Sequence, residues 1–194
     1  MAAWQRQYPQ LQNSYLLTLP GRVSRRKGIY DFLDIVAVLA ARGVSVHGLV
    51  AGEFPRGATG PCRKLSSRAN SPALKGLITF AGYRSDVREI MAVSSVVLSL
   101  SRQPEAFGRT VNEALGLGVP VAGYAHGGVG EQLARHFPAG RVPPLDTGAM
   151  VDLLEAWNTA PPSMQGVSPY TLADMLDSTL ELYRKAKELS LIHI

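Results

Sequence analysis

Short apolar runs of strand-like length alternate along this chain with segments of helical periodicity, and this alternation constrains the fold more than any other feature. The predicted strands are residues 15–19, 44–50, 77–80, 95–100, 119–123 and 140–142. The predicted helices are residues 29–40, 86–93, 109–118, 129–136 and 147–157, with a last helix opening at Ser168-Pro169. This alternation predicts an α/β fold, a Rossmann-like, doubly wound, parallel six-stranded sheet with helices on both faces.

Two stretches break the alternation and are predicted to be loops. Residues 52–72 are rich in Gly, Pro, Ser and Arg, and residues 160–168 in Pro and Ser. The last helix carries an apolar stripe, which predicts that it docks onto another surface. The stripe consists of Leu172, Met175, Leu176, Leu180 and Tyr183.

The composition excludes several classes of protein. With 46% hydrophobic and 18% charged residues over 194 positions, the chain is a soluble globular domain and not a disordered or collagen-like one. The single cysteine, Cys62, cannot form an internal disulfide, and the four histidines are too scattered for a zinc site, so a reducing, cytosolic compartment fits best. The first residues lack the apolar core of a signal peptide.

Positive charge is concentrated in the first part of the chain. Residues 1–110 carry 15 basic and 6 acidic side chains, whereas residues 111–194 carry 5 basic and 9 acidic ones. Because 15 of the 20 basic residues are arginine, we expect a polyanionic partner: a phosphate-bearing small ligand, a nucleic acid or an anionic lipid surface. A solvated basic face is the alternative.

A first candidate site follows the first predicted strand, in the segment Gly21-Arg-Val-Ser-Arg-Arg-Lys-Gly28. Its two glycines bracket a tight loop at the N-terminus of the next helix, where N–H groups and the helix dipole favour an anion. Arg22 and Lys27 can converge on that anion, and a diphosphate suits their spacing. A basic surface turn is the alternative reading of this segment.

A second candidate site follows the fourth predicted strand, in Glu105-Ala-Phe-Gly-Arg-Thr-Val-Asn-Glu113. Along a helix, two residues eight positions apart are separated by about 12 Å, too far for paired acid and base action on one glycosidic bond. We expect each carboxylate to accept hydrogen bonds from a different part of one ligand, as a carboxylate grips a vicinal diol. The alternatives are a capping acid at Glu105 and a surface acid at Glu113.

A third segment, Gly123-Tyr-Ala-His-Gly-Gly-Val-Gly-Glu131, forms a glycine-rich turn before a predicted helix. It does not match Gly-x-Gly-x-x-Gly, so it is no dinucleotide-binding fingerprint. Glu131 suits the first turn of a helix for structural reasons. His126 is a candidate ligand contact, with a structural role as the alternative.

These three motifs, in this order on a parallel α/β pattern, resemble the C-terminal, donor-binding half of the retaining group 1 (family 4) GT-B glycosyltransferases over about residues 14–160. The resemblance implies one half of a GT-B fold and glycosyl transfer, of the hexosyltransferase kind, from a UDP-, GDP- or ADP-linked sugar with retention of configuration. It also implies that no cofactor and no essential metal take part, because basic side chains neutralise the leaving diphosphate.

The resemblance further implies roles for individual residues. Arg22 and Lys27 would clasp the donor diphosphate, and Glu105 would contact the donor sugar, so these three form the expected catalytic set. Glu113 would hold the ribose hydroxyls. Further donor contacts are expected from Gly21, Phe107, Gly108, Arg109 and Thr110, and from Tyr83 and Arg84 near the nucleobase.

Members of this family have a second, N-terminal domain that binds the acceptor, and we expect this chain to lack it. Residues 1–13 would then be an interdomain remnant, residues 14–160 the nucleotide-sugar-binding domain, residues 161–189 a linker and a helix that packs on the missing domain, and residues 190–194 a non-domain tail. Such a chain binds a donor without completing the transfer. The resemblance also implies polysaccharide or glycolipid biosynthesis, in the cytoplasm or peripherally on the inner face of the membrane.

Two other functions stay open. The arginine-rich half could serve a nucleic-acid-binding module through Arg25-Arg26-Lys27 and Arg63-Lys64, although few aromatic residues accompany this charge and no RNA-binding or helix-turn-helix signature is present. A non-catalytic interaction domain that docks through its last helix is the other alternative.

Overall fold

The structure is a computed structural model that describes residue 11 and residues 13–54, 59–164 and 170–191. A six-stranded sheet in the order β3-β2-β1-β4-β5-β6 forms its centre, and every neighbouring pair of strands is parallel. The strands are β1 (Tyr15–Pro20), β2 (Val46–Ala51), β3 (Ile78–Phe80), β4 (Val96–Ser99), β5 (Val121–Tyr124) and β6 (Arg141–Val142). This is the strand order of a Rossmann-type sheet, so the predicted fold class is confirmed.

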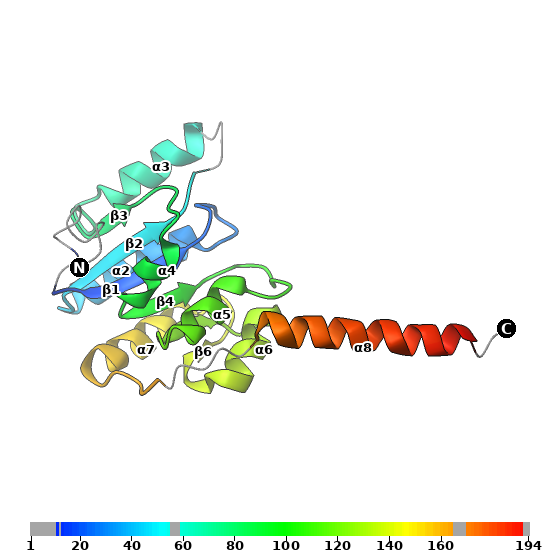
Figure 1. The fold of residues 1–194 in the computed structure, drawn as a ribbon. Coiled ribbons are helices and arrows are strands. Elements are labelled where there is room, and N and C mark those ends of the chain that lie inside the picture. Colours follow the sequence, from blue (N-terminus) through cyan, green and yellow to red (C-terminus); the bar gives the residue numbers. More distant parts are fainter. Residues whose placement is uncertain (1–10, 12, 55–58, 165–169, 192–194) are drawn as a thin grey trace.

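Helices cover both faces of the sheet (Figure 1). On one face, α2 (Ile29–Ala41) contacts α3 (Thr59–Ala69) and α7 (Thr147–Thr159). On the other, α5 (Arg109–Gly116) contacts both α4 (Val87–Ala92) and α6 (Gly127–His136). Right-handed connections between parallel strands produce this division, because the strand order reverses between β1 and β4.

The predicted strands and helices of residues 14–160 are present, with ends that differ by at most two residues. The loop predicted over residues 52–72 is wrong in part, because it contains α3. Gly60 and Pro61 lie in the first turn of α3, where proline is tolerated. In the second half of α3 only Leu65 and Ala69 are buried. Two apolar positions are too few to form the repeating stripe by which a helix is predicted from sequence.

The core forms where the apolar periodicity places it. β1 and β2 are buried almost throughout, as expected for central parallel strands with helices on both faces. Helix α2 buries one stripe against the sheet, and each fully buried side chain of this size stabilises the fold by about 1.5–3 kcal/mol. The stripe consists of Ile29, Phe32, Leu33, Val36 and Leu39.

The last helix, α8 (Leu172–Leu191), extends away from the rest of the molecule (Figure 1). Thr171 caps it: the Asp174 N–H donates to the Thr171 hydroxyl over 3.1 Å, and the Asp174 carboxylate accepts the Thr171 N–H over 3.0 Å. The predicted start at Ser168-Pro169 lies outside the described residues, and the helix begins at Leu172.

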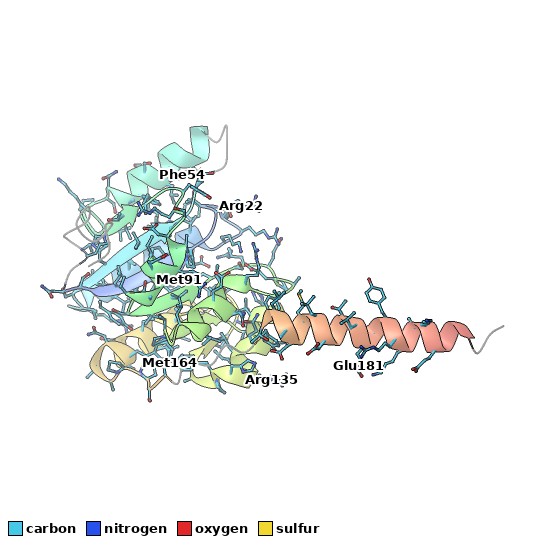
Figure 2. The ribbon with its side chains drawn as sticks, in the orientation of Figure 1. Arg22, Phe54, Met91, Arg135, Met164 and Glu181 are labelled. Carbon is cyan, nitrogen blue, oxygen red and sulfur yellow. The ribbon has the colours of Figure 1, made fainter. Side chains whose placement is uncertain are left out.

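The apolar stripe of α8 is exposed. Its five side chains, predicted from the sequence, are 49–71% accessible to solvent. Side chains stand around α8 along its length, including Glu181 (Figure 2). Docking of α8 onto another domain therefore stays a prediction.

Gly28 provides a test of the fold at the start of α2. Its φ is +76°, and a Cβ there would lie 2.1 Å from the Leu100 carbonyl oxygen, in the loop after β4. We expect Gly28→Ala to destabilise the protein by more than about 3 kcal/mol, because a left-handed conformation at a non-glycine residue costs about 1–2 kcal/mol and a steric clash adds to it. Thermal or urea unfolding measures this change.

Gly43→Ala is the matched control. Gly43 also has a left-handed φ, +85°, but nothing lies within 4 Å of its expected Cβ. Only the conformational cost of about 1–2 kcal/mol should appear. Equal destabilisation by the two substitutions would contradict the close approach between Gly28 and the loop after β4.

Candidate functional site

Two loops meet where the strand order reverses. β1 pairs with both β2 and β4, so the loops that follow β1 and β4 leave the same edge of the sheet as neighbours. The Arg102 N–H donates to the Arg26 carbonyl over 2.8 Å and joins the two loops through their main chains. Open α/β sheets bind ligands at such a switch point.

A cavity of about 550 Å³ lies between the two loops. Four cationic side chains and one carboxylate line it, which leaves a net charge of +3. Arg22 stands on the loop after β1 (Figure 2). The lining residues are Pro20, Gly21, Arg22, Ser24, Arg26, Lys27, Glu105, Ala106, Phe107, Gly108, Arg109 and Thr110.

Lys27 and Glu105 form an ion pair in this cavity. The Lys27 ammonium donates to Glu105 Oε1 over 2.5 Å, and the Ser101 hydroxyl donates to the same oxygen. The Lys27 side chain is 33% exposed and the Glu105 side chain 17%, so the pair is partly shielded from water. The two motifs found in the sequence are thus joined by direct contact.

Glu105 is ionised at neutral pH. Burial on its own would raise the pKa of this carboxyl, but the hydrogen bonds from Lys27 and Ser101, and the charges of Lys27 and Arg26, outweigh that effect. The pKa of Glu105 is therefore held below its ordinary value. As an ionised carboxylate, Glu105 only accepts hydrogen bonds.

Asp31 anchors the loop that follows β4. It is buried in the first turn of α2, where its two carboxylate oxygens accept hydrogen bonds from Arg102 over 2.6 and 2.8 Å. The Tyr124 hydroxyl, on β5, donates to the same carboxylate over 3.2 Å, and burial together with the Asp31 charge raises the pKa of Tyr124. This network fixes α2, β5 and the loop after β4 relative to one another.

The glycine-rich segment supports the loop of Glu105 by close packing. Gly127 begins α6, and the Gly128 N–H donates to the Glu105 carbonyl over 2.8 Å. A Cβ at Gly128 would lie 2.6 Å from the Phe107 Cα, so a side chain there would collide with the loop. The Gln132 side-chain amide donates to the Phe107 carbonyl. Of the segment predicted as a turn, residues 123 and 124 end β5 and residues 127–131 belong to α6.

His126 has a structural partner. Its Nε2 lies 2.7 Å from the Ser101 carbonyl oxygen, and because a carbonyl only accepts, Nε2 carries the proton. Glu131 is exposed on α6 and does not line the cavity. Both residues fit the structural alternative that the sequence left open.

Gly108 determines how α5 begins. It is the N-cap of α5 with a φ of +84°, and a Cβ there would lie 2.7 Å from the Val129 side chain. Helix α5 therefore starts at Arg109, and its first two residues line the cavity. A helix N-terminus favours an anion at this place.

Three of the predicted donor contacts lie outside the cavity lining. Tyr83 is 74% exposed on the loop after β3. In the same loop Arg84 donates to Asp86 over 2.8 and 2.7 Å, and this pairing lowers the pKa of Asp86. Glu113 is exposed, one turn into α5. Their roles toward the nucleobase and ribose stay predictions.

The sequence patterns did not single out Arg26 or Ser101. Arg26 lines the cavity beside Lys27, but a run of three cations does not show which side chains turn toward one site. Ser101 directly follows the fourth predicted strand, and its place four residues before Glu105 is its only signal. The fold adds both residues to the candidate site.

The polar side chains that line the cavity are four cations, one carboxylate and the hydroxyl groups of Ser24 and Thr110. In the described part of the chain, no three His, Cys, Asp or Glu side chains are grouped so that they could hold a metal ion.

None of the helices described here combines the length and apolar character needed to cross a membrane.

Comparison with protein families identifies one match. The sequence profile of the family described as glycosyl transferases group 1 matches residues 14–157, more than half of the chain. Curated protein sequences give no significant match. The family match covers both loops of the cavity.

Solved structures share the fold. HepE from Anabaena, in complex with UDP and glucose, superposes with a TM-score of 0.72 at 23% identity over 79% of this chain and 41% of that chain. A glycosyltransferase from Rickettsia africae gives a TM-score of 0.74 at 21% identity over 94% and 50%. The C-terminal domain of LpcC, a group 1 glycosyl transferase from Francisella tularensis, gives 0.66 at 21% identity over 80% and 82%.

This chain spans about two fifths of the length of HepE and half of the Rickettsia enzyme, and it is comparable in extent to the isolated Francisella domain. The parallel sheet and its helices are those of a GT-B glycosyltransferase domain. Because the family profile extends from β1 into α7, the chain belongs to the group 1 glycosyltransferases.

Proposed function

We propose that residues 14–160 bind a nucleotide-diphosphate sugar between the loops after β1 and β4, as the donor-binding domain of a retaining, family 4 glycosyltransferase. One observation carries this proposal: Arg22, Arg26, Lys27 and Arg109 converge with Glu105 on one cavity at the switch point of the sheet. A diphosphate needs such a set of cations, and a sugar hydroxyl needs an acceptor such as Glu105 beside them.

The cationic side chains of the cavity bind the diphosphate. Each charge-assisted hydrogen bond from Arg22 or Lys27 to a phosphate oxygen is worth about 1.5–3 kcal/mol. As the bond between sugar and phosphate breaks, negative charge grows on the diphosphate, and cations already in place stabilise it without reorganising. In this proposal these side chains neutralise the charge of the leaving diphosphate, a role that a metal ion has in other enzymes, and no cofactor takes part.

The two carboxylates accept hydrogen bonds from hydroxyl groups of the donor. Glu105 is ionised and accepts hydrogen bonds from the donor sugar, next to the main chain of Phe107 and Gly108. Glu113 lies one turn further along α5 and would hold the ribose. Tyr83 and Arg84, in the loop after β3, would contact the nucleobase. HepE is known in complexes with UDP and UDP-glucose, which supports a UDP-sugar as the first donor to test.

We propose that a second domain, outside these 194 residues, binds the acceptor. The exposed apolar stripe of α8 supports this proposal, because it offers a surface for such a domain to cover. That domain would also supply any peripheral contact with the inner face of a membrane in polysaccharide or glycolipid biosynthesis. In this proposal the 194 residues alone bind the donor, in the cytoplasm, but do not transfer its sugar because the acceptor-binding domain is absent.

Four arginines outside the cavity favour this proposal over nucleic-acid binding, because each forms an ion pair within the protein. Arg68 pairs with Asp34, Arg84 with Asp86 and Arg102 with Asp31, and Arg42 pairs with two acids on α7. These pairs neutralise the charge of four arginines, which a nucleic-acid backbone would otherwise contact.

Titration calorimetry of UDP, GDP and ADP, each free and linked to glucose, tests the proposal. We expect wild-type protein to bind one nucleoside diphosphate in the micromolar to millimolar range. The double variant Arg22→Ala, Lys27→Ala should lose at least about a hundredfold in affinity, because two charge-assisted contacts disappear. Lys75→Ala, an exposed cation before β3, is the control and should bind like wild type. Folded wild-type protein that binds none of the six would overturn the proposal.

The ionisation of Glu105 gives a second test. In Lys27→Met the burial of Glu105 and its hydrogen bond from Ser101 persist while its strongest cation is lost, so the pKa of Glu105 should rise from its lowered wild-type value toward the ordinary value of about 4.3. NMR titration of carboxyl-labelled glutamate measures both pKa values. Because the wild-type pKa is lowered, the ion pair stabilises the fold above pH about 4.3, and this contribution disappears as the pH falls through the folded-state pKa. An unchanged pKa in Lys27→Met would contradict the assigned pairing.

A further inference from the structure

Glu105 places a negative charge inside a cavity that otherwise attracts anions. Its side chain and its main chain are both hydrogen-bonded: the carboxylate accepts from Lys27 and Ser101, and the main-chain carbonyl accepts the Gly128 N–H. A carboxylate held there repels any anion that enters, and it also occupies the Lys27 ammonium. The site therefore weakens its own affinity for a diphosphate.

We propose that Glu105 is the residue by which the site favours the sugar-nucleotide donor over the nucleoside diphosphate that remains after transfer. This inference rests on the proposed function, since it assumes that the diphosphate lies among the cations of the cavity. It assigns to Glu105 a role in selectivity and product release in addition to contact with the sugar.

The two ligands differ in charge next to Glu105. The terminal phosphate of a free nucleoside diphosphate has a second ionisation near pH 6, as a phosphate monoester has, so at neutral pH it carries an additional negative charge. In the donor, the sugar esterifies that phosphate and removes this charge. Repulsion by Glu105 is consequently larger for the product than for the donor.

The two ligands also differ in hydrogen-bond donors. A sugar hydroxyl donates to an ionised carboxylate, whereas a phosphate oxygen only accepts and gains nothing from Glu105. Either ligand must share Lys27 with Glu105, whose Oε1 lies 2.5 Å from the ammonium. When Lys27 turns partly toward the diphosphate, the sugar hydroxyl groups of the donor give Glu105 new hydrogen bonds. The product has no sugar and gives it none.

Glu105→Gln tests this selectivity, because glutamine keeps the shape and removes the charge. Calorimetry at fixed salt and pH 7 compares UDP with UDP-glucose, and GDP and ADP with their glucose conjugates. We expect the product to bind about tenfold more tightly in Glu105→Gln, the effect of one charge at a few ångströms in a partly hydrated site, while the donor binds no more tightly than to wild type. The ratio of the two dissociation constants is the readout.

Glu131→Gln is the matched control. It removes the same charge from an exposed position on α6 that does not line the cavity, and it should leave both affinities unchanged. Thermal unfolding establishes that each variant is folded, and Glu105→Ser replaces Glu105→Gln if the latter does not fold.

The pH dependence distinguishes the terminal phosphate from a general effect of charge. The gain in product affinity in Glu105→Gln should be larger at pH 7, where the phosphate is doubly ionised, than at pH 5, where it is not. Equal gains for donor and product, or no gain for the product, would overturn the inference and leave the proposed function intact. Wild-type protein that binds none of these nucleotides overturns both.

Discussion

The parallel pairing of β1 with β4 is the constraint on which the candidate site depends. The paired segment is short, with Leu17 beside Val96 and Thr18 beside Val97, but the strand order reverses there. The helix after β1 then lies on one face of the sheet and the helix after β4 on the other. Because the two loops part in this way, a cavity opens between them without any long insertion.

The distribution of ion pairs concentrates positive charge at this cavity. Asp31, Asp34 and Asp86 each pair with an arginine outside the lining. Within the described residues no carboxylate forms an ion pair with Arg22 or Arg26, and both line the cavity. Part of the excess of basic residues in positions 1–110 is thus gathered at one place in the fold.

The sequence predicted what depends on local pattern. The apolar spacing of Ile29, Phe32 and Leu33 determines which face of α2 is buried, and two motifs that follow predicted strands led to Arg22, Lys27 and Glu105. It did not predict α3, in which Leu65 and Ala69, one turn apart, are the buried apolar residues of the described side chains.

Contacts between distant parts of the chain also escaped prediction. The partners of Asp31 lie 71 and 93 residues away, in the loop after β4 and on β5, and no spacing rule joins such positions. The fold nevertheless uses its two carboxylates near the switch point differently. Asp31 is buried and held by a planar guanidinium and a phenol, groups with few orientations, so it fixes the loop. Glu105 is held by a flexible ammonium and a rotatable hydroxyl, partners that can exchange for a ligand, so this carboxylate can adapt where Asp31 cannot.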